Sequence, residues 1–196
     1  MIEEKILQTI SNVEPCDNLE REHQKDAIVW IKSGAEIWRT KKPDTPPKHL
    51  VCYTAAVDIN KKSLFMGYHK KAQLIMLSGG HVDYGETLLQ AANRESLEEL
   101  GVKRPVWLNG GQPILITQVK TVGKTAGHID VDLWFAFKAN SASDNFATSE
   151  LMREMENPRW YTFDEVLNLS VNPKNLETDP HMHRFIEKLK KVIIPN

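Results

Sequence analysis

The chain has 196 residues, 41% of them hydrophobic, which favours one sizeable core in a single domain with an appendage. Twenty-five Lys and Arg balance twenty-six Asp and Glu, and the net charge of -1 argues against a surface for a nucleic-acid polymer or an anionic membrane. The cysteines, Cys16 and Cys52, have no metal or redox spacing. The sequence contains no signal-peptide pattern and no apolar run of membrane-spanning length. We therefore expect a cytoplasmic protein without a membrane partner.

Two helical patterns open the chain. Apolar residues recur at helical spacing over residues 2–13, and Asp17 is a candidate N-cap for a second helix. The second pattern carries an apolar stripe made of Ala27, Ile28, Ile31, Ala35 and Trp38. Residues 40–48 contain three prolines and exclude a regular helix or a central strand. We therefore predict an N-terminal helical extension with a Pro-rich linker over residues 1–48, followed by the main domain over residues 49–196.

Strand patterns dominate the main domain. The predicted strands cover residues 50–59, 64–69, 74–77, 114–121, 128–138 and 158–162. The strand at 128–138 alternates between an apolar face and a polar face, which is typical of a strand with one wet side. The polar face carries His128, Asp130, Asp132 and Trp134. Helical patterns after Glu86 and near residues 164–169 and 180–192 complete an α/β sandwich of three layers with a mixed sheet.

The most specific pattern lies at residues 80–102, which read G-x5-E-x7-R-E-x-x-E-E-x-G-V. On an α-helix, Glu95, Glu98 and Glu99 lie at i, i+3 and i+4 and share one face. Like charges at this spacing destabilise a helix, and a hard divalent cation held by oxygen ligands would compensate. An acidic run alone is usually a solvated face, but that reading does not explain the fixed glycines and arginine around it. The pattern predicts a metal-binding catalytic site.

This stretch resembles the Nudix box, G-x5-E-x7-R-E-U-x-E-E-x-G-U, in which U is a bulky apolar residue. Every fixed position is present, whereas Ser96 departs from the pattern at the first U position. Residues 75–80 also lack the aromatic residue and proline that many members have there. The resemblance implies a Nudix-type α/β/α sandwich that hydrolyses a pyrophosphate linkage, usually in a nucleoside diphosphate joined to another group, with Mg2+ or Mn2+ as cofactor.

The same resemblance assigns the metal ligands to Glu95, Glu98, Glu99 and the backbone carbonyl of Gly80. It gives Arg94 the role of steadying these carboxylates by ion pairing. Glu86 has two readings, a charge favourable to the helix dipole or a contact to the metal.

The sequence leaves two assignments for the general base, a glutamate of the box or an acidic residue of a later loop. Glu98 and Glu99 are the favoured choices within the box. The later loop offers Glu150, Glu154 and Glu156, and we keep Glu154 as its candidate. A solvated loop explains any one of these three equally well.

The sequence gives weaker evidence for the residues that contact the substrate. His69 and Lys71 leave a strand before the box and would meet phosphates, although an ordinary basic turn fits the same residues. Trp134 would stack on a base, although a wet strand face explains it as well. The partner we expect is a small phosphorylated molecule.

Two further function classes fit the fold. A non-catalytic nucleotide-binding sensor would be expected to lack box carboxylates, and this chain keeps all of them. A prenyl diphosphate isomerase would need a cysteine near the box, where none stands. The apolar stripe of the extension either packs on its own domain or forms the interface of a homodimer, and from the sequence we favour the dimer.

Overall fold

A mixed eight-stranded sheet forms the centre of the computed structural model, which describes residues 1–41, 45–125, 127–170 and 177–193. Residues 42–44 of the expected Pro-rich linker and residue 126, between two of the predicted strands, lie outside the described residues. The strands are β1 (Lys48–Asp58), β2 (Ser63–His69), β3 (Leu74–Met76), β4 (Ser78–His81), β5 (Val106–Trp107), β6 (Leu115–Lys120), β7 (Ile129–Lys138) and β8 (Met155–Thr162). β1 and β7 are parallel at the centre of the sheet, and the other pairings between named strands are antiparallel.

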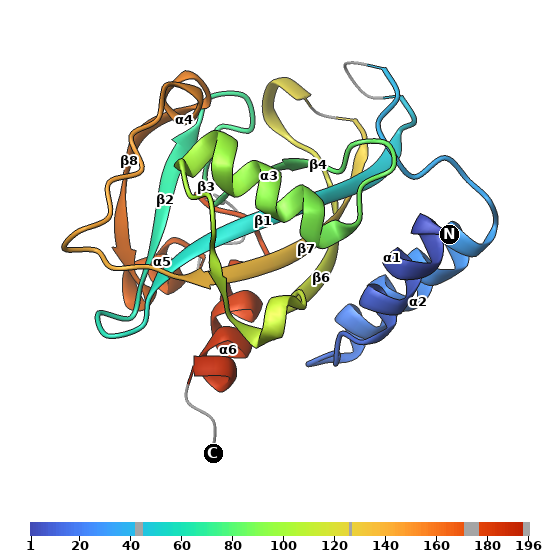
Figure 1. The fold of residues 1–196 in the computed structure, drawn as a ribbon, viewed down its shortest axis with the longest axis horizontal. Helices are drawn as coiled ribbons and strands as arrows, with labels where there is room; N and C mark the ends of the chain where they lie inside the picture. Colours follow the sequence, from blue (N-terminus) through green and yellow to red (C-terminus); the bar gives the residue numbers. More distant parts are fainter. Residues whose placement is uncertain (42–44, 126, 171–176, 194–196) are drawn as a thin grey trace.

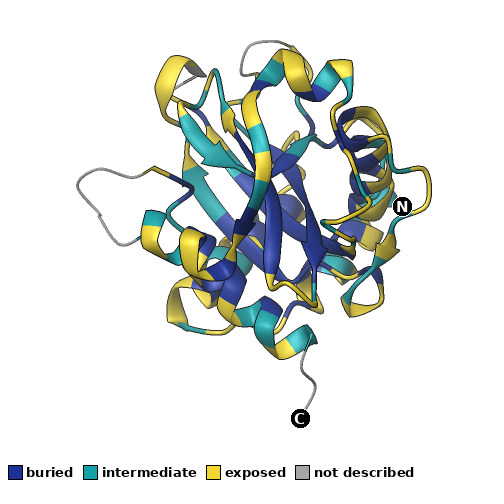
Figure 2. Cartoon of the chain, turned by 90° about the vertical axis from the view of Figure 1, so that its left-hand side faces the viewer, coloured by how far each residue is buried: buried dark blue, intermediate teal, exposed yellow. Residues whose placement is uncertain are grey.

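Helices cover both faces of this sheet (Figure 1). They are α1 (Ile2–Ser11), α2 (Asn18–Lys32), α3 (Leu88–Leu100), α4 (Ser149–Glu154), α5 (Phe163–Leu169) and α6 (Met182–Ile193). α1, α2 and α3 pack on one face, whereas α5 and α6 pack on the other. Figure 2 shows the central strands as buried and much of the outer surface of the helices as exposed. The three-layer α/β/α sandwich predicted from the sequence is confirmed.

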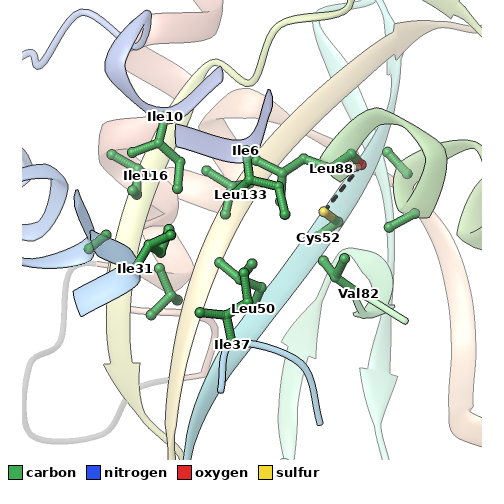
Figure 3. Packing of buried hydrophobic residues seen from close by; sticks show 14 of the residues in the cluster. Ile6, Ile10, Ile31, Ile37, Leu50, Cys52, Val82, Leu88, Ile116 and Leu133 are labelled. Carbon is green, nitrogen blue, oxygen red and sulfur yellow. Dashed lines mark hydrogen bonds between the residues drawn. The ribbon is translucent and has the colours of Figure 1, made fainter. Parts of the chain in front are cut away.

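The N-terminal extension is part of the main core. Ile6 and Ile10 of α1 and Ile31 of α2 are almost fully buried. Figure 3 shows these side chains among residues of the sheet, including Leu50 and Leu133. The apolar stripe that suggested a dimer therefore finds its partners within the same chain, and it gives no support to the prediction of a homodimer.

The face of β7 that was predicted to be wet is covered at Trp134, whereas His128, Asp130 and Asp132 line a cavity. Trp134 and Asp132 on this face are both 0% exposed. The indole ring of Trp134 lies 4.6 Å from the ring of Tyr53 and 5.2 Å from the ring of Phe185 in α6. The alternation indicated the two faces correctly, but it could not show that a C-terminal helix would cover the more polar one at Trp134.

The second helix ends earlier than its apolar stripe suggested. Asp17 is its N-cap, as predicted, and accepts a hydrogen bond from the backbone N–H of Glu20. The helix stops at Lys32, and Gly34 follows with a φ of 76° in the left-handed region. Trp38 is nevertheless buried, because the chain returns to the same core after the turn.

The structure adds short elements that the sequence pattern did not predict. β4 and β5 are short strands, and α4 occupies a segment that we expected to be a loop. Within the described residues, every helix is too short or too polar to cross a membrane.

Candidate active site

The box residues meet where β4 passes along α3. Gly79 and Gly80 of β4 pair with Tyr53 and Cys52 of β1, and the backbone of β4 packs against the box helix at Glu95 and Glu99. A Cβ atom on Gly80 would lie 2.4 Å from Oε1 of Glu95. Glycine at this position therefore leaves the room in which the carboxylate approaches the strand.

The box helix has sharply defined ends. Thr87 is the N-cap, and it forms a capping box with Gln90. Gly101 ends the helix with a φ of 71°, in the left-handed region that glycine adopts without strain. Glu86 therefore lies just before the helix rather than opening it.

The three box glutamates differ in their exposure. Glu95 and Glu99 are each 7% exposed, whereas the side chain of Glu98 is 53% exposed. Oε2 of Glu99 accepts a hydrogen bond of 2.9 Å from the backbone N–H of Gly79. Burial raises the pKa of Glu95 to about 7 and the pKa of Glu99 to about 8. Burial disfavours the charged forms, so both carboxylates would gain from a bound cation.

Arg94 connects the carboxylates of the box. Its Nε and Nη2 each donate a hydrogen bond of 2.9 Å to a different carboxylate oxygen of Glu86. Its Nη1 donates to Glu95 at 2.5 Å and to Glu98 at 3.3 Å. Nη2 also donates to the carbonyl oxygen of His81 at 2.8 Å. One guanidinium thus holds the start of the helix, its acidic face and the end of β4 together.

This network gives Glu86 a role that neither sequence reading named. Its carboxylate accepts hydrogen bonds from Arg94. It also accepts a hydrogen bond of 3.0 Å from the backbone N–H of Asp83. Glu86 therefore fixes both the loop before the helix and the arginine that orients the other carboxylates.

The carboxylates line a cavity of about 500 Å³. Gly80, Arg94 and the three box glutamates share its walls with residues of α4, including Arg153 and Glu154. The donor set consists of oxygen atoms, and its negative charge exceeds the charge that Arg94 can compensate. This chemistry fits a hard divalent cation such as Mg2+ or Mn2+.

Glu154 lies at the end of α4, on the far side of the cavity. Its carboxylate oxygens lie 3.7 Å from Nε2 of His69 and 3.5 Å from Nζ of Lys71. The hydrogen bond with His69 and the charge of Lys71 lower the pKa of Glu154 to about 2. The structure thus brings together the predicted loop base and both predicted phosphate contacts.

Trp134 is the exception among the predicted site residues. Its Nε1 donates a hydrogen bond of 2.9 Å to Oγ1 of Thr117, and its ring is fully buried. No part of the ring is available to a substrate, so the predicted stacking role is wrong.

A second cavity of about 800 Å³ adjoins the first. The two share Gly79, Gly80, His81, Arg39 and Glu154, and the walls of the second include Tyr53, Leu74, Met76 and Val119. Sequence analysis missed both Arg39 and His81. Nη1 of Arg39 lies 3.2 Å from Nε2 of His81, and burial together with the charge of Arg39 lowers the pKa of His81 to about 2. His81 was visible inside the box, but nothing in the sequence placed Arg39 beside it.

The sequence profile of the NUDIX domain matches residues 47–187, which is well over half of the chain. This chain belongs to the Nudix hydrolase family. The match begins next to the predicted domain start at residue 49, and it supports hydrolysis of a pyrophosphate-type linkage as the general class of reaction.

Solved structures of Nudix proteins share the fold of this hydrolase. A MutT protein from Methanosarcina mazei is 18% identical, with a TM-score of 0.54 over 74% of this chain and 97% of that chain. A NUDIX hydrolase from Nitrosomonas europaea is 18% identical, with a TM-score of 0.51 over 72% of this chain and 87% of that chain. The E. coli dihydroneopterin triphosphate pyrophosphohydrolase is 14% identical, with a TM-score of 0.51 over 78% of this chain and 99% of that chain. No curated protein sequence matches the chain significantly.

Proposed function

We propose that this Nudix hydrolase cleaves a pyrophosphate linkage in a nucleoside diphosphate derivative, with Mg2+ or Mn2+ as its cofactor. The observation that carries the proposal is the convergence of Glu95, Glu98 and Glu99 in one cavity beside Gly80, with Arg94 paired to Glu95 and Glu98. A chain that had kept the fold only to bind nucleotides would have no need of this concentration of negative charge.

Glu95, Glu98, Glu99 and the carbonyl oxygen of Gly80 are the groups we assign to the cation. A bound Mg2+ or Mn2+ would neutralise phosphate charge and lower the pKa of a water molecule. Glu95 and Glu99 are fixed by burial and by their contacts with Arg94 and Gly79, which suits ligands that must keep one geometry.

We assign the general base to a box glutamate rather than to Glu154. The pKa of Glu154 is lowered to about 2 by its basic neighbours, which makes its carboxylate a weak proton acceptor. Glu98 is the most exposed of the box glutamates and lines the cavity, so it can reach a water there. In the reaction, the water oxygen bonds to phosphorus, the bridging P–O bond breaks and the water proton passes to the carboxylate.

The two adjoining cavities suggest how a substrate divides between them. Phosphates would lie in the charged cavity, whose walls include Arg39 and Arg153, with Lys71 in the wall of the adjoining cavity. The organic group would enter the larger cavity, whose walls contain many apolar side chains. His69 would act mainly by holding Glu154, which also pairs with Lys71.

The test is a panel of nucleoside triphosphates, nucleoside diphosphate sugars and dinucleoside polyphosphates, incubated with the full chain and Mg2+ or Mn2+. Released phosphate and nucleoside monophosphates are separated by chromatography. We expect at least one compound to be cleaved catalytically. Binding of panel members without cleavage would support the nucleotide sensor instead and overturn the proposal.

A further inference from the structure

A second group of metal-ligand side chains adjoins the box carboxylates, since His81 lines both cavities and His128 and Asp130 line the larger one. His49, His81, His128 and Asp130 each offer one ligand atom, and these atoms all lie within 4.8 Å of one another. His49 is 0% exposed and His128 is 4% exposed, so the group is built into the fold rather than scattered over the surface. Among the described residues, this is the one group of histidines and acids with such convergence.

Strand pairing brings the group together. His49 lies on β1 directly opposite Asp130 on β7, and His128 precedes the same strand. On the other side of β1, Val51 pairs with His81 at the end of β4. The rings of His81 and His128 lie 4.7 Å and 5.0 Å from the ring of His49. The parallel pairing of β1 with β7 therefore places His49 and Asp130, with His128 just before β7, and the antiparallel pairing of β1 with β4 adds His81.

The hydrogen bonds around His49 leave one of its nitrogens facing an oxygen. Nδ1 lies 2.9 Å from the carbonyl oxygen of Pro46, which can only accept, so Nδ1 carries the proton in the neutral ring. Nε2 then presents a lone pair towards Oδ1 of Asp130, 3.1 Å away. Both atoms are buried, and neither has a hydrogen-bond partner. Two facing acceptors in a buried place require a proton or a cation between them.

A metal ion satisfies this arrangement better than a proton does. Oδ1 of Asp130 lies 3.1 Å from Nε2 of His49 and 3.2 Å from Nε2 of His128. Ligands bound to zinc at about 2.0–2.1 Å in a tetrahedron lie roughly 3.3 Å apart, so these pairs already have the required spacing. A proton can bridge one such pair, whereas a cation can bind all four groups.

The surroundings supply the contacts that orient histidine ligands. A metal-bound imidazole usually gives its other N–H to a carbonyl, a hydroxyl or a carboxylate, which fixes the ring. Nδ1 of His49 meets the carbonyl oxygen of Pro46 at 2.9 Å, and Nδ1 of His128 lies 3.0 Å from the hydroxyl oxygen of Thr121. His81 is the adjustable member of the group, because its ring is half-buried and its Nε2 contacts Arg39.

We propose that His49, His81, His128 and Asp130 form a second metal site, for a late first-row divalent cation such as Zn2+. Imidazole nitrogens select such ions, in contrast to the oxygen ligands of the box, which suit Mg2+ or Mn2+. Four protein ligands make a closed site of the structural kind. The ion joins β1, β4 and β7 next to the carbonyl of His81, to which Arg94 donates a hydrogen bond.

Cobalt substitution tests this site without any measurement of hydrolysis. The full chain is stripped of metal with a chelator and titrated with Co2+, whose tetrahedral complexes absorb strongly in the visible range and whose octahedral oxygen complexes absorb weakly. We compare the wild type with Asp130→Asn and His128→Gln. His183→Gln is the matched control, because His183 is exposed on α6 and lies outside the group.

We expect one equivalent of tetrahedral Co2+ in the wild type and in His183→Gln, displaced by Zn2+. Asp130→Asn and His128→Gln should weaken binding by about 10-fold or more. A folded wild type without the intense absorption overturns the proposal. Retention of the absorption in both cluster variants overturns it as well, because the ion would then lie elsewhere.

X-ray absorption at the zinc edge keeps the proposal testable if the cluster variants do not fold. The sample is the Glu98→Gln variant loaded with one equivalent of Zn2+. The substitution weakens the box as a competing zinc site. We expect the outer-shell scattering of imidazole ligands together with oxygen. Coordination by oxygen alone would place the zinc at carboxylates and overturn the assignment.

Discussion

The two groups of potential metal ligands in this protein differ in how the chain assembles them. The box carboxylates come from one helix, where spacing along the sequence already places them on one face. The histidine group comes from β1, β4 and β7, whose pairing is fixed by the tertiary fold. A ligand set on a helix can therefore be read from the sequence, whereas a ligand set across a sheet becomes visible in the structure.

The two groups also differ in what keeps them in place. Ion pairs and hydrogen bonds to Arg94 hold the carboxylates, and burial among strands holds His49 and His128. Substitutions that change charge in the box should therefore strongly reduce metal affinity and turnover, with little effect on the stability of the fold. The following variants test that difference, beginning with the largest expected effect.

Replacing Glu98 by Gln removes one charge from the box with little change of shape. Glu98 is exposed enough for the fold to survive, and we expect turnover to fall by about 100-fold or more. Glu187→Gln is the matched control, since Glu187 is exposed on α6 and pairs with Lys190 at 2.9 Å. Steady-state kinetics on any compound that the wild type cleaves provide the measurement. Equal turnover in Glu98→Gln and wild type would contradict our assignment of the box.

Replacing Arg94 by Lys keeps the positive charge but removes the planar guanidinium group with its several N–H donors. A lysine cannot bind both oxygens of Glu86 while also contacting Glu95, so the carboxylates should lose their common orientation. We expect the affinity for Mn2+ to fall by about 10- to 100-fold, as measured by calorimetry. Arg153→Lys is the control, because Arg153 pairs with Glu150 at the exposed edge of the cavity. An unchanged affinity in Arg94→Lys would show that the arginine does not organise the ligands.

Replacing Gly80 by Ala tests the close approach of β4 to the box. The new Cβ would lie 2.4 Å from Oε1 of Glu95, so the carboxylate must move. We expect Mn2+ affinity and turnover each to fall by about 10-fold. Gly85→Ala is the comparison, because Gly85 has a φ of 81° but open space around it, so it should lose stability and keep its metal affinity. Equal metal affinities in the two variants would argue against the steric account.

Replacing Glu154 by Gln should give the smallest effect, and a pH-dependent one. The folded state lowers the pKa of Glu154 to about 2, so its ionisation stabilises the fold above about pH 4.5. That contribution is lost as the pH falls towards 2. We expect Glu154→Gln to lower the unfolding free energy by about 1 kcal/mol at neutral pH and by almost nothing near pH 2.

Urea titrations at a series of pH values measure this difference. Glu156→Gln is the matched control, because Glu156 is exposed two residues further along the chain. A loss that is independent of pH, or equal in the two variants, would show that the contacts with His69 and Lys71 do not stabilise the ionised carboxylate.

The sequence predicted much of the fold because its signals are local. The box helix and the cap at Asp17 depend on neighbouring residues, and the structure confirms both of them. Trp134 and the covered face of β7 were predicted wrongly, because burial there depends on α6, far away in the sequence. The proximity of Arg39 to His81 depends in the same way on the tertiary fold, because 42 positions separate them in the sequence.

The central claim is that the box carboxylates hold a divalent cation that hydrolysis requires. The most direct measurement follows turnover of one cleaved compound by metal-stripped wild type while Mg2+ or Mn2+ is titrated in, with Glu98→Gln alongside. We predict no turnover in chelator, recovery as the added ion saturates the box, and little recovery in Glu98→Gln at the same concentrations. Full turnover in chelator, or equal recovery in the two proteins, would contradict the account.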